Sequence, residues 1–111
     1  LGGRYYFEIN TNSLKVEVKK DFGEYKEGNW WITRSNIYGK YLAFIGSNDG
    51  VSTFPNSFGI FDAESLEIIW SDGILLKDRA KEGFFNNPPL LNDSLLAIVD
   101  SNKKMHVYRK D

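Results

Sequence analysis

The chain has 111 residues, of which 41% are hydrophobic and 15% are aromatic, so it can form one packed domain and is too apolar for global disorder. Its 14 basic and 15 acidic residues give a formal net charge of -1, which gives no electrostatic support for binding nucleic acid or an anionic membrane surface. Cysteine is absent, which excludes disulfides and thiolate metal sites, and no apolar run approaches the roughly 20 residues that span a bilayer.

Short apolar segments separated by turn formers begin at the N-terminus. Residues 4–9, 14–19, 30–37 and 41–45 are predicted strands, with polar loops or turns between them. Residues 14–19 alternate apolar and polar side chains, which is typical of a half-buried strand. Residues 41–45 are continuously apolar, which predicts a strand buried on both faces.

The clearest hairpin lies at residues 58–70, where two apolar runs flank the turn Asp-Ala-Glu-Ser. Residues 77–82 have room for one helical turn, which is too short to be stable without packing. Two prolines, at 88 and 89, then stop any helix. Further strands are predicted at 90–91, 95–99 and 105–108. About nine short strands with turns between them indicate an all-β protein.

The predicted strands repeat along the chain at a nearly fixed period. Residues 41–48 match residues 95–102, with Leu, Ala, Ser and Asn recurring identically, at an offset of 95 − 41 = 54. Residues 9–18 match residues 61–70 at 61 − 9 = 52, and residues 58–61 match residues 105–108 at 105 − 58 = 47. The shorter last offset places an insertion of 54 − 47 = 7 residues in the predicted loop 50–57, where extra length costs little.

When the strands of one repeat unit are labelled a to d, the chain runs c-d, a-b-c-d, a-b-c. A four-stranded unit of about 50 residues is typical of a β-propeller blade. We therefore expect an incomplete propeller of antiparallel, four-stranded, propeller-like blades in a single segment, 1–111. A partial blade is expected at 1–20, a full blade at 30–71 and a partial blade at 84–111. Because the first residue is Leu1 and the pattern starts and stops inside a unit, we expect a piece of a longer repeat protein.

Asp62, Ser65 and Trp70 stand where quinoprotein-like (PQQ-type) β-propeller repeats place Asp, Thr and Trp around the turn between strands c and d, so the chain resembles that family. The glycine of that motif is Leu66 here and Leu14 in the first copy. The resemblance covers most of the chain and implies propeller blades. The nonenzymatic repeat proteins of that superfamily, including outer-membrane assembly scaffolds, look more similar than its dehydrogenases, which implies no cofactor.

Each polar candidate has a structural interpretation beside a functional one. Asp62 is expected to accept hydrogen bonds from turn amides, as Asn10 would in the first copy. Residues 48–50 (Asn-Asp-Gly) could begin a calcium loop, but residues 51–57 offer no carboxylate to continue it, so no metal site is predicted. His106 is the only histidine and has no evident nucleophile as partner, so no catalytic residue is predicted.

Aromatic residues supply the candidate binding surface, which consists of Trp30, Trp31, Phe54, Phe84 and Phe85. The two Trp and the two adjacent Phe recur at an offset of 84 − 30 = 54. Such rings could stack on a carbohydrate or a peptide. Their recurrence also fits packing between blades, and in an alternating strand only one residue of each pair can point inward.

The expected function is a noncatalytic scaffold for protein interaction, which uses loops such as 21–29 and 50–57. Its expected partners are further blades or other copies of the chain, since an exposed blade face is a sticky apolar surface. A carbohydrate- or peptide-binding module that uses the exposed aromatics is the alternative, and a fragment of a quinoprotein-type enzyme is the third hypothesis. The composition does not predict a compartment.

Overall fold

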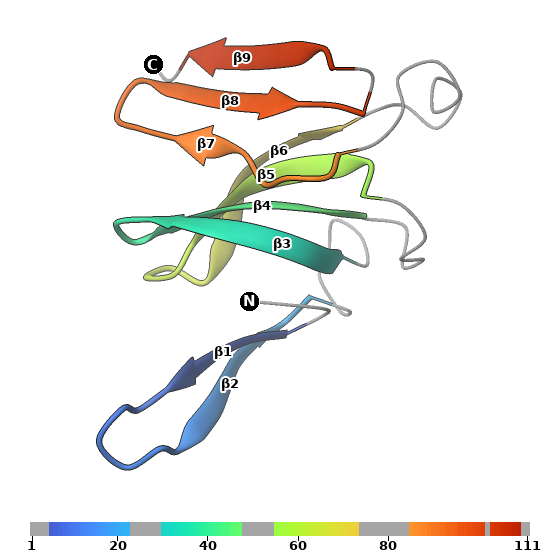
Figure 1. The fold of residues 1–111 in the computed structure, drawn as a ribbon. Helices are drawn as coiled ribbons and strands as arrows, with labels where there is room; N and C mark the ends of the chain where they lie inside the picture. The colour runs from blue at the N-terminus through green and yellow to red at the C-terminus, as the bar shows by residue number, and fades with distance from the viewer. Residues whose placement is uncertain (1–4, 23–29, 48–54, 74–84, 102, 110–111) are drawn as a thin grey trace.

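The computed structural model describes residues 5–22, 30–47, 55–73, 85–101 and 103–109 of the protein. Within these ranges the chain forms nine β-strands and no α-helix, and all strand pairs are antiparallel, so the all-β prediction is confirmed. The strands form three separate sheets, which lie one above another in Figure 1. The predicted helical turn at 77–82 lies outside the described residues.

Each sheet is a simple meander of consecutive strands. The N-terminal sheet contains β1 (Tyr5–Ile9) and β2 (Val16–Asp21). The middle sheet contains β3 (Trp31–Tyr38), β4 (Tyr41–Ser47), β5 (Ser57–Asp62) and β6 (Glu67–Gly73), in that order. The C-terminal sheet contains β7 (Leu90–Leu91), β8 (Leu95–Val99) and β9 (Met105–Arg109). This grouping of two, four and three strands is the one that the sequence repeat predicts.

Several predicted strand boundaries differ from the observed ones by one or more residues; β3, for example, spans Trp31–Tyr38 instead of 30–37, and β4 continues to Ser47. The second strand begins at Val16 instead of residue 14, because Leu14 has a φ of 58° and belongs to the turn. The hairpin predicted at 58–70 extends further, since Ser57 pairs with Gly73. The prediction that residues 41–45 are buried on both faces is confirmed: all of β4 after Tyr41 is buried.

The strand registers repeat at the offsets found in the sequence. Leu42 of β4 pairs with Ile37 on one side and Phe61 on the other. Leu96 of β8, which is 54 residues further along, pairs with Leu91 and Tyr108. These partners are displaced by 91 − 37 = 54 and 108 − 61 = 47 residues. Strands β7, β8 and β9 therefore reproduce the pairing of β3, β4 and β5.

Hydrophobic side chains fill two cores, one on each face of the middle sheet. The first core lies against the N-terminal sheet and contains Tyr6, Phe22, Trp30, Ile32, Leu42, Phe44 and Phe61. The second core lies against the C-terminal sheet and contains Ile45, Phe58, Ile60, Phe85, Leu96 and Ile98. Every residue of β5 is buried, because alternate side chains of a strand point to opposite faces and both faces of this sheet are covered.

The same aromatic contact joins successive sheets. The rings of Tyr6 and Phe61 have centroids 4.9 Å apart and an interplanar angle of 56°. The rings of Phe58 and Tyr108 have centroids 5.5 Å apart and an angle of 52°. Tyr6 and Phe58 are equivalent at 58 − 6 = 52, and Phe61 and Tyr108 are equivalent at the offset of 47. One packing rule therefore builds both inter-sheet contacts.

Candidate functional site

The turns after β1 and β5 have the same hydrogen bonds. Asn10 Oδ1 accepts the amides of Asn12 and Ser13 at 2.9 and 3.1 Å. Asp62 Oδ1 accepts the amides of Glu64 and Ser65 at 2.9 and 3.3 Å. The predicted turn-capping role of both residues is confirmed. In each turn the side-chain oxygen accepts backbone amides two and three residues further along, as Asn and Asp do in Asx turns.

The carboxylate of Asp62 is stabilised in its charged form. The Glu64 amide, then the Ser65 amide and the ammonium group of Lys40, hold the pKa of Asp62 below its usual value, against the opposing effect of burial. Lys40 Nζ lies 3.6 Å from Asp62 Oδ2 and 3.5 Å from Glu64 Oε2. A carboxylate with these partners is bound to its own turn, which makes it a structural group.

His106 has an acidic partner. Its Nε2 lies 2.9 Å from Oδ2 of Asp100, whose side chain is fully buried. The other carboxylate oxygen of Asp100 accepts the amide of Lys104 at 3.0 Å, and the backbone of Asp100 also pairs with Lys103 and Lys104. Both oxygens of this carboxylate therefore hold the turn between β8 and β9 to the strand that follows it. This Asp–His pair fixes a turn.

In the repeat, Asp100 and His106 occupy positions at which the middle sheet has glycine. Asp100 is equivalent to Gly46 at 100 − 46 = 54, and His106 is equivalent to Gly59 at 106 − 59 = 47. A Cβ on Gly59 would lie 2.6 Å from the carbonyl oxygen of Trp70 in β6. The described part of the C-terminal sheet has no fourth strand beside β9, so this obstacle is absent there and a histidine fits.

The described ranges contain no group of three or more His, Asp and Glu side chains that could hold a metal ion. The possible calcium loop at residues 48–50 lies outside these ranges. In the same part of the chain, no helix is long and apolar enough to cross a membrane.

The structure separates the predicted aromatic surface. Trp30 and Phe85 are only 3% and 1% exposed, because they belong to the two cores. Trp30 packs on Phe44 with ring centroids 5.3 Å apart. Trp31 is 41% exposed, because adjacent residues of an extended chain point to opposite sides. The other two members, Phe54 and Phe84, lie outside the described residues.

Among the described residues, exposed apolar side chains gather on the outermost sheets instead. The N-terminal sheet carries an N-terminal outer face, which consists of Phe7, Ile9, Val16 and Val18. Phe7 pairs with Val18 and Ile9 pairs with Val16, and residues directly opposite each other share a face. Tyr6 points the other way, into the first core. The exposed fractions of the four side chains range from 40% for Phe7 to 61% for Val16.

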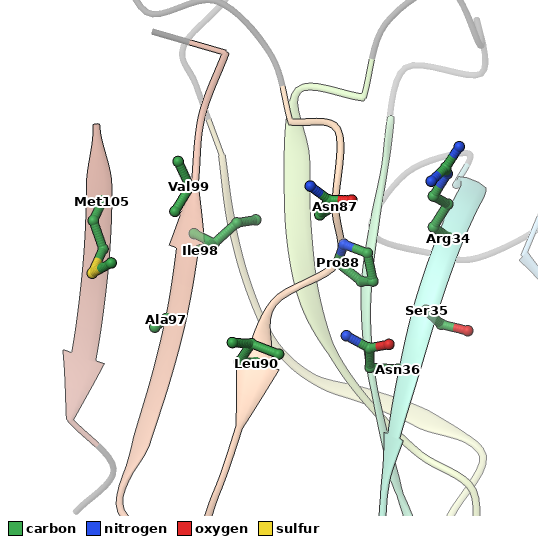
Figure 2. Close-up of a pocket in the computed structure, with 10 residues that line it drawn as sticks. All are labelled: Arg34, Ser35, Asn36, Asn87, Pro88, Leu90, Ala97, Ile98, Val99 and Met105. Atoms are coloured by element: carbon green, nitrogen blue, oxygen red, sulfur yellow. The ribbon is translucent and has the colours of Figure 1, made fainter. Parts of the chain in front are cut away.

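The C-terminal sheet carries a C-terminal outer face, which consists of Leu90, Ala97, Val99, Met105 and Val107. Ala97 pairs with Leu90 on one side and Val107 on the other, and Val99 pairs with Met105, so all five share one face. Leu90, Val99, Met105 and Val107 are 69%, 46%, 64% and 54% exposed. Four of the five side chains are drawn in Figure 2, along the three strands of this sheet.

An open pocket of about 730 Å³ lies over this face and extends to β3. Arg34, Ser35 and Asn36 border it from β3, as Figure 2 shows, and Asn87 and Pro88 border it from the segment before β7. The amide of Asn36 also donates to the carbonyl oxygen of Pro89 at 3.4 Å, which joins the middle and C-terminal sheets here. The pocket therefore has an apolar floor and a polar rim.

The repeat shows what each outer face corresponds to. The middle-sheet equivalents of Val99, Met105 and Val107 are 0%, 2% and 6% exposed; they are Ile45, Phe58 and Ile60, which pack against the C-terminal sheet. The equivalents of Ile9 and Val16 are Phe61 and Ile68, which pack against the N-terminal sheet. At these five positions the outer faces are exposed copies of positions that another sheet covers in the middle of the molecule.

The sequence interpretation missed these two faces, although it expected sticky apolar blade faces in general. The signal was present in the sequence: the offsets of 54 and 47 map Val99, Met105 and Val107 onto the buried residues of β4 and β5.

Comparison of the chain with models of known protein families, with curated proteins and with solved structures finds no match.

Proposed function

We propose that the chain is a noncatalytic segment of β-propeller-type repeats that acts as a protein-interaction scaffold. The observation that carries the proposal is the repeated register: β7–β9 reproduce the pairing of β3–β5, and one aromatic contact recurs at both junctions between sheets. Sheets that stack by one repeated rule are typical of repeat proteins, in which each unit contacts only its neighbours.

The exposed outer faces support an interaction role. Monomeric soluble proteins rarely expose contiguous apolar patches larger than a few hundred Å², and such patches mark interaction sites. Here both outer faces consist of β-branched, long aliphatic and aromatic side chains on regular strands. A flat apolar sheet face is suited to another sheet, because its side chains stand in the regular rows that a facing sheet can interdigitate with.

The polar groups of the described residues support a role without catalysis. The carboxylates of Asp62 and Asp100 each accept backbone amides of their own turn. Their hydrogen bonds are therefore committed to holding hairpins in shape. The alternative of glycan or peptide stacking keeps only Trp31 as an exposed aromatic of the predicted set among the described residues.

Size-exclusion chromatography with multi-angle light scattering tests the proposal. The chain has a mass of 12.8 kDa, and a scaffold with two open sheet faces is expected to give a larger, concentration-dependent mass. Apolar contacts are non-directional and weakly affected by salt, so the assembly is expected to persist when the salt concentration is raised. A mass of one chain at every concentration tested would contradict the proposal.

A further inference from the structure

We infer that the C-terminal outer face binds the N-terminal outer face of a second copy of this chain, which joins copies head to tail. This inference rests on the proposed scaffold function and names the partner and both surfaces. The partner is a second copy because the chain itself carries the two faces that its own repeat brings together.

The direction of stacking argues for head-to-tail contact. At both observed junctions, one face of a sheet meets the opposite face of the next sheet along the chain. Tyr6 and Phe58 lie on the faces that meet the following sheet. Phe61 and Tyr108 lie on the faces that meet the preceding sheet. No junction joins two faces of the same kind.

The two outer faces are of opposite kinds. Met105 and Val107, on the C-terminal outer face, are equivalent to Phe58 and Ile60, so this face is of the kind that meets a following sheet. Ile9, on the N-terminal outer face, is equivalent to Phe61, so this face is of the kind that meets a preceding sheet. A second copy therefore offers the face that continues the stack.

The chemistry of the two faces is also complementary. The N-terminal outer face presents one ring and three branched aliphatic side chains, and the C-terminal outer face presents a leucine, two valines and the flexible Met105 around the small side chain of Ala97. Large groups facing small ones allow two layers to interdigitate, and methionine adapts to an uneven surface. Arg34 and Asn36 would lie at the polar rim of this contact, beside the apolar floor.

A head-to-tail contact is heterologous, so copies form a closed ring or an open stack according to the rotation between them, and an open stack keeps one uncovered face at each end. This property gives a test by paired variants of the full chain. Val107→Glu places a charge on the C-terminal outer face, and Ile9→Glu places one on the N-terminal outer face. The two side chains are 54% and 53% exposed, so neither change is expected to disturb the fold. Thr33→Glu, at an exposed position of β3, is the matched control for added charge.

Each variant is checked by far-ultraviolet circular dichroism and then by light scattering. Head-to-tail contact predicts that Val107→Glu and Ile9→Glu are each monomers of 12.8 kDa, whereas Thr33→Glu assembles like the unchanged chain. A mixture of the two monomeric variants is expected to form a 1:1 complex of about twice that mass, because one intact face of each kind is present.

Three outcomes would overturn the inference. Assembly of the Ile9→Glu variant alone would show contact between two C-terminal faces, and assembly of the Val107→Glu variant alone would show contact between two N-terminal faces. A mixture that stays monomeric would exclude contact between the two kinds of face. In all three cases the unchanged chain still assembles, so the scaffold proposal stands; only a monomeric unchanged chain contradicts both.

Discussion

Leu14 and Leu66, which are 66 − 14 = 52 residues apart, have nearly the same left-handed backbone conformation, with φ values of 58° and 61°. Each closes the turn of a hairpin by donating its amide to a carbonyl oxygen four residues back, Asn10 at 2.7 Å and Asp62 at 2.8 Å. The turn thus has the conformation that favours glycine, although the residue is leucine in both copies.

We expect Leu14→Gly to raise the free energy of unfolding by about 1 kcal/mol, because a left-handed conformation costs a non-glycine residue about 1–2 kcal/mol and part of this gain is offset by the extra chain entropy of glycine. Leu14 is 75% exposed, so little packing is lost. Leu66→Gly is the matched control: Leu66 packs against the first core, and losing that contact is expected to cancel the gain or reverse it. Urea unfolding of both variants measures the difference. Equal stabilisation by the two substitutions would contradict this account.

A second prediction compares two equivalent positions with different burial. Phe58 is 2% exposed and contacts Trp70, Phe85 and Tyr108, whereas Met105, which is 47 residues further along, is 64% exposed. Phe58→Ala is expected to cost about 3–5 kcal/mol of unfolding free energy, because it leaves a cavity in the second core. Met105→Ala is expected to change it by less than about 0.5 kcal/mol in dilute solution. Urea unfolding at low protein concentration checks both. A cost above roughly 2 kcal/mol for Met105→Ala, about four times the expected limit, would mean that its face is already covered within one chain.

The grouping of strands was predictable from the sequence because the repeat carries it. The apolar runs at 41–45 and 95–99 fix strand b of each unit, and once the offset is known the neighbouring strands follow. The turn residues were predictable for the same reason, since Asn10 and Asp62 recur before equal turns and act through their own side chains.

The orientation of Trp70 was not predictable in this way. Trp70 packs against Phe58 and Tyr108 in the second core, but Val18, its equivalent, is 59% exposed on the N-terminal outer face. The register of β5 and β6 shifts between Ile60 and Phe61, whereas that of β1 and β2 shifts further from its turn. A bulge exchanges the faces of all residues beyond it, and no residue type marks its place in either strand.

The third prediction concerns alkaline pH. Burial, followed by a hydrogen bond to a carboxylate, raises the pKa of Tyr6 and of Tyr108 from 10.0 to about 12. The hydroxyl of Tyr6 donates to Glu8 Oε2 at 2.8 Å, and that of Tyr108 donates to Asp72 Oδ2 at 3.0 Å. The folded chain keeps these protons at pH values where the unfolded chain loses them. The resulting stability is complete below about pH 10 and is lost as the pH rises towards about 12.

Urea unfolding at a series of alkaline pH values measures this loss. Tyr6→Phe and Tyr108→Phe are each expected to reduce the fall in unfolding free energy between about pH 10 and about pH 12, and the double variant is expected to reduce it most. If the unfolding free energies of the unchanged chain and of the double variant depend on pH in the same way, these two hydroxyls do not cause the loss.

The fourth prediction concerns the carboxylate that ties the turn after β8 to β9. Asp100→Ala removes the acceptor of the Lys104 amide and the partner of His106 in a site where the side chain has no exposed surface, so we expect a cost of about 2–3 kcal/mol. Asp100→Asn is the matched variant of the same shape. Its oxygen can still accept the Lys104 amide and its NH₂ group can donate to the ring nitrogen of His106, so the expected cost is below about 1 kcal/mol. Hydrogen exchange of the Lys104 amide separates the two: it is expected to speed up in the alanine variant and to stay slow in the asparagine variant. Fast exchange in both variants would show that the turn depends on the charge of the carboxylate and not on its hydrogen bonds.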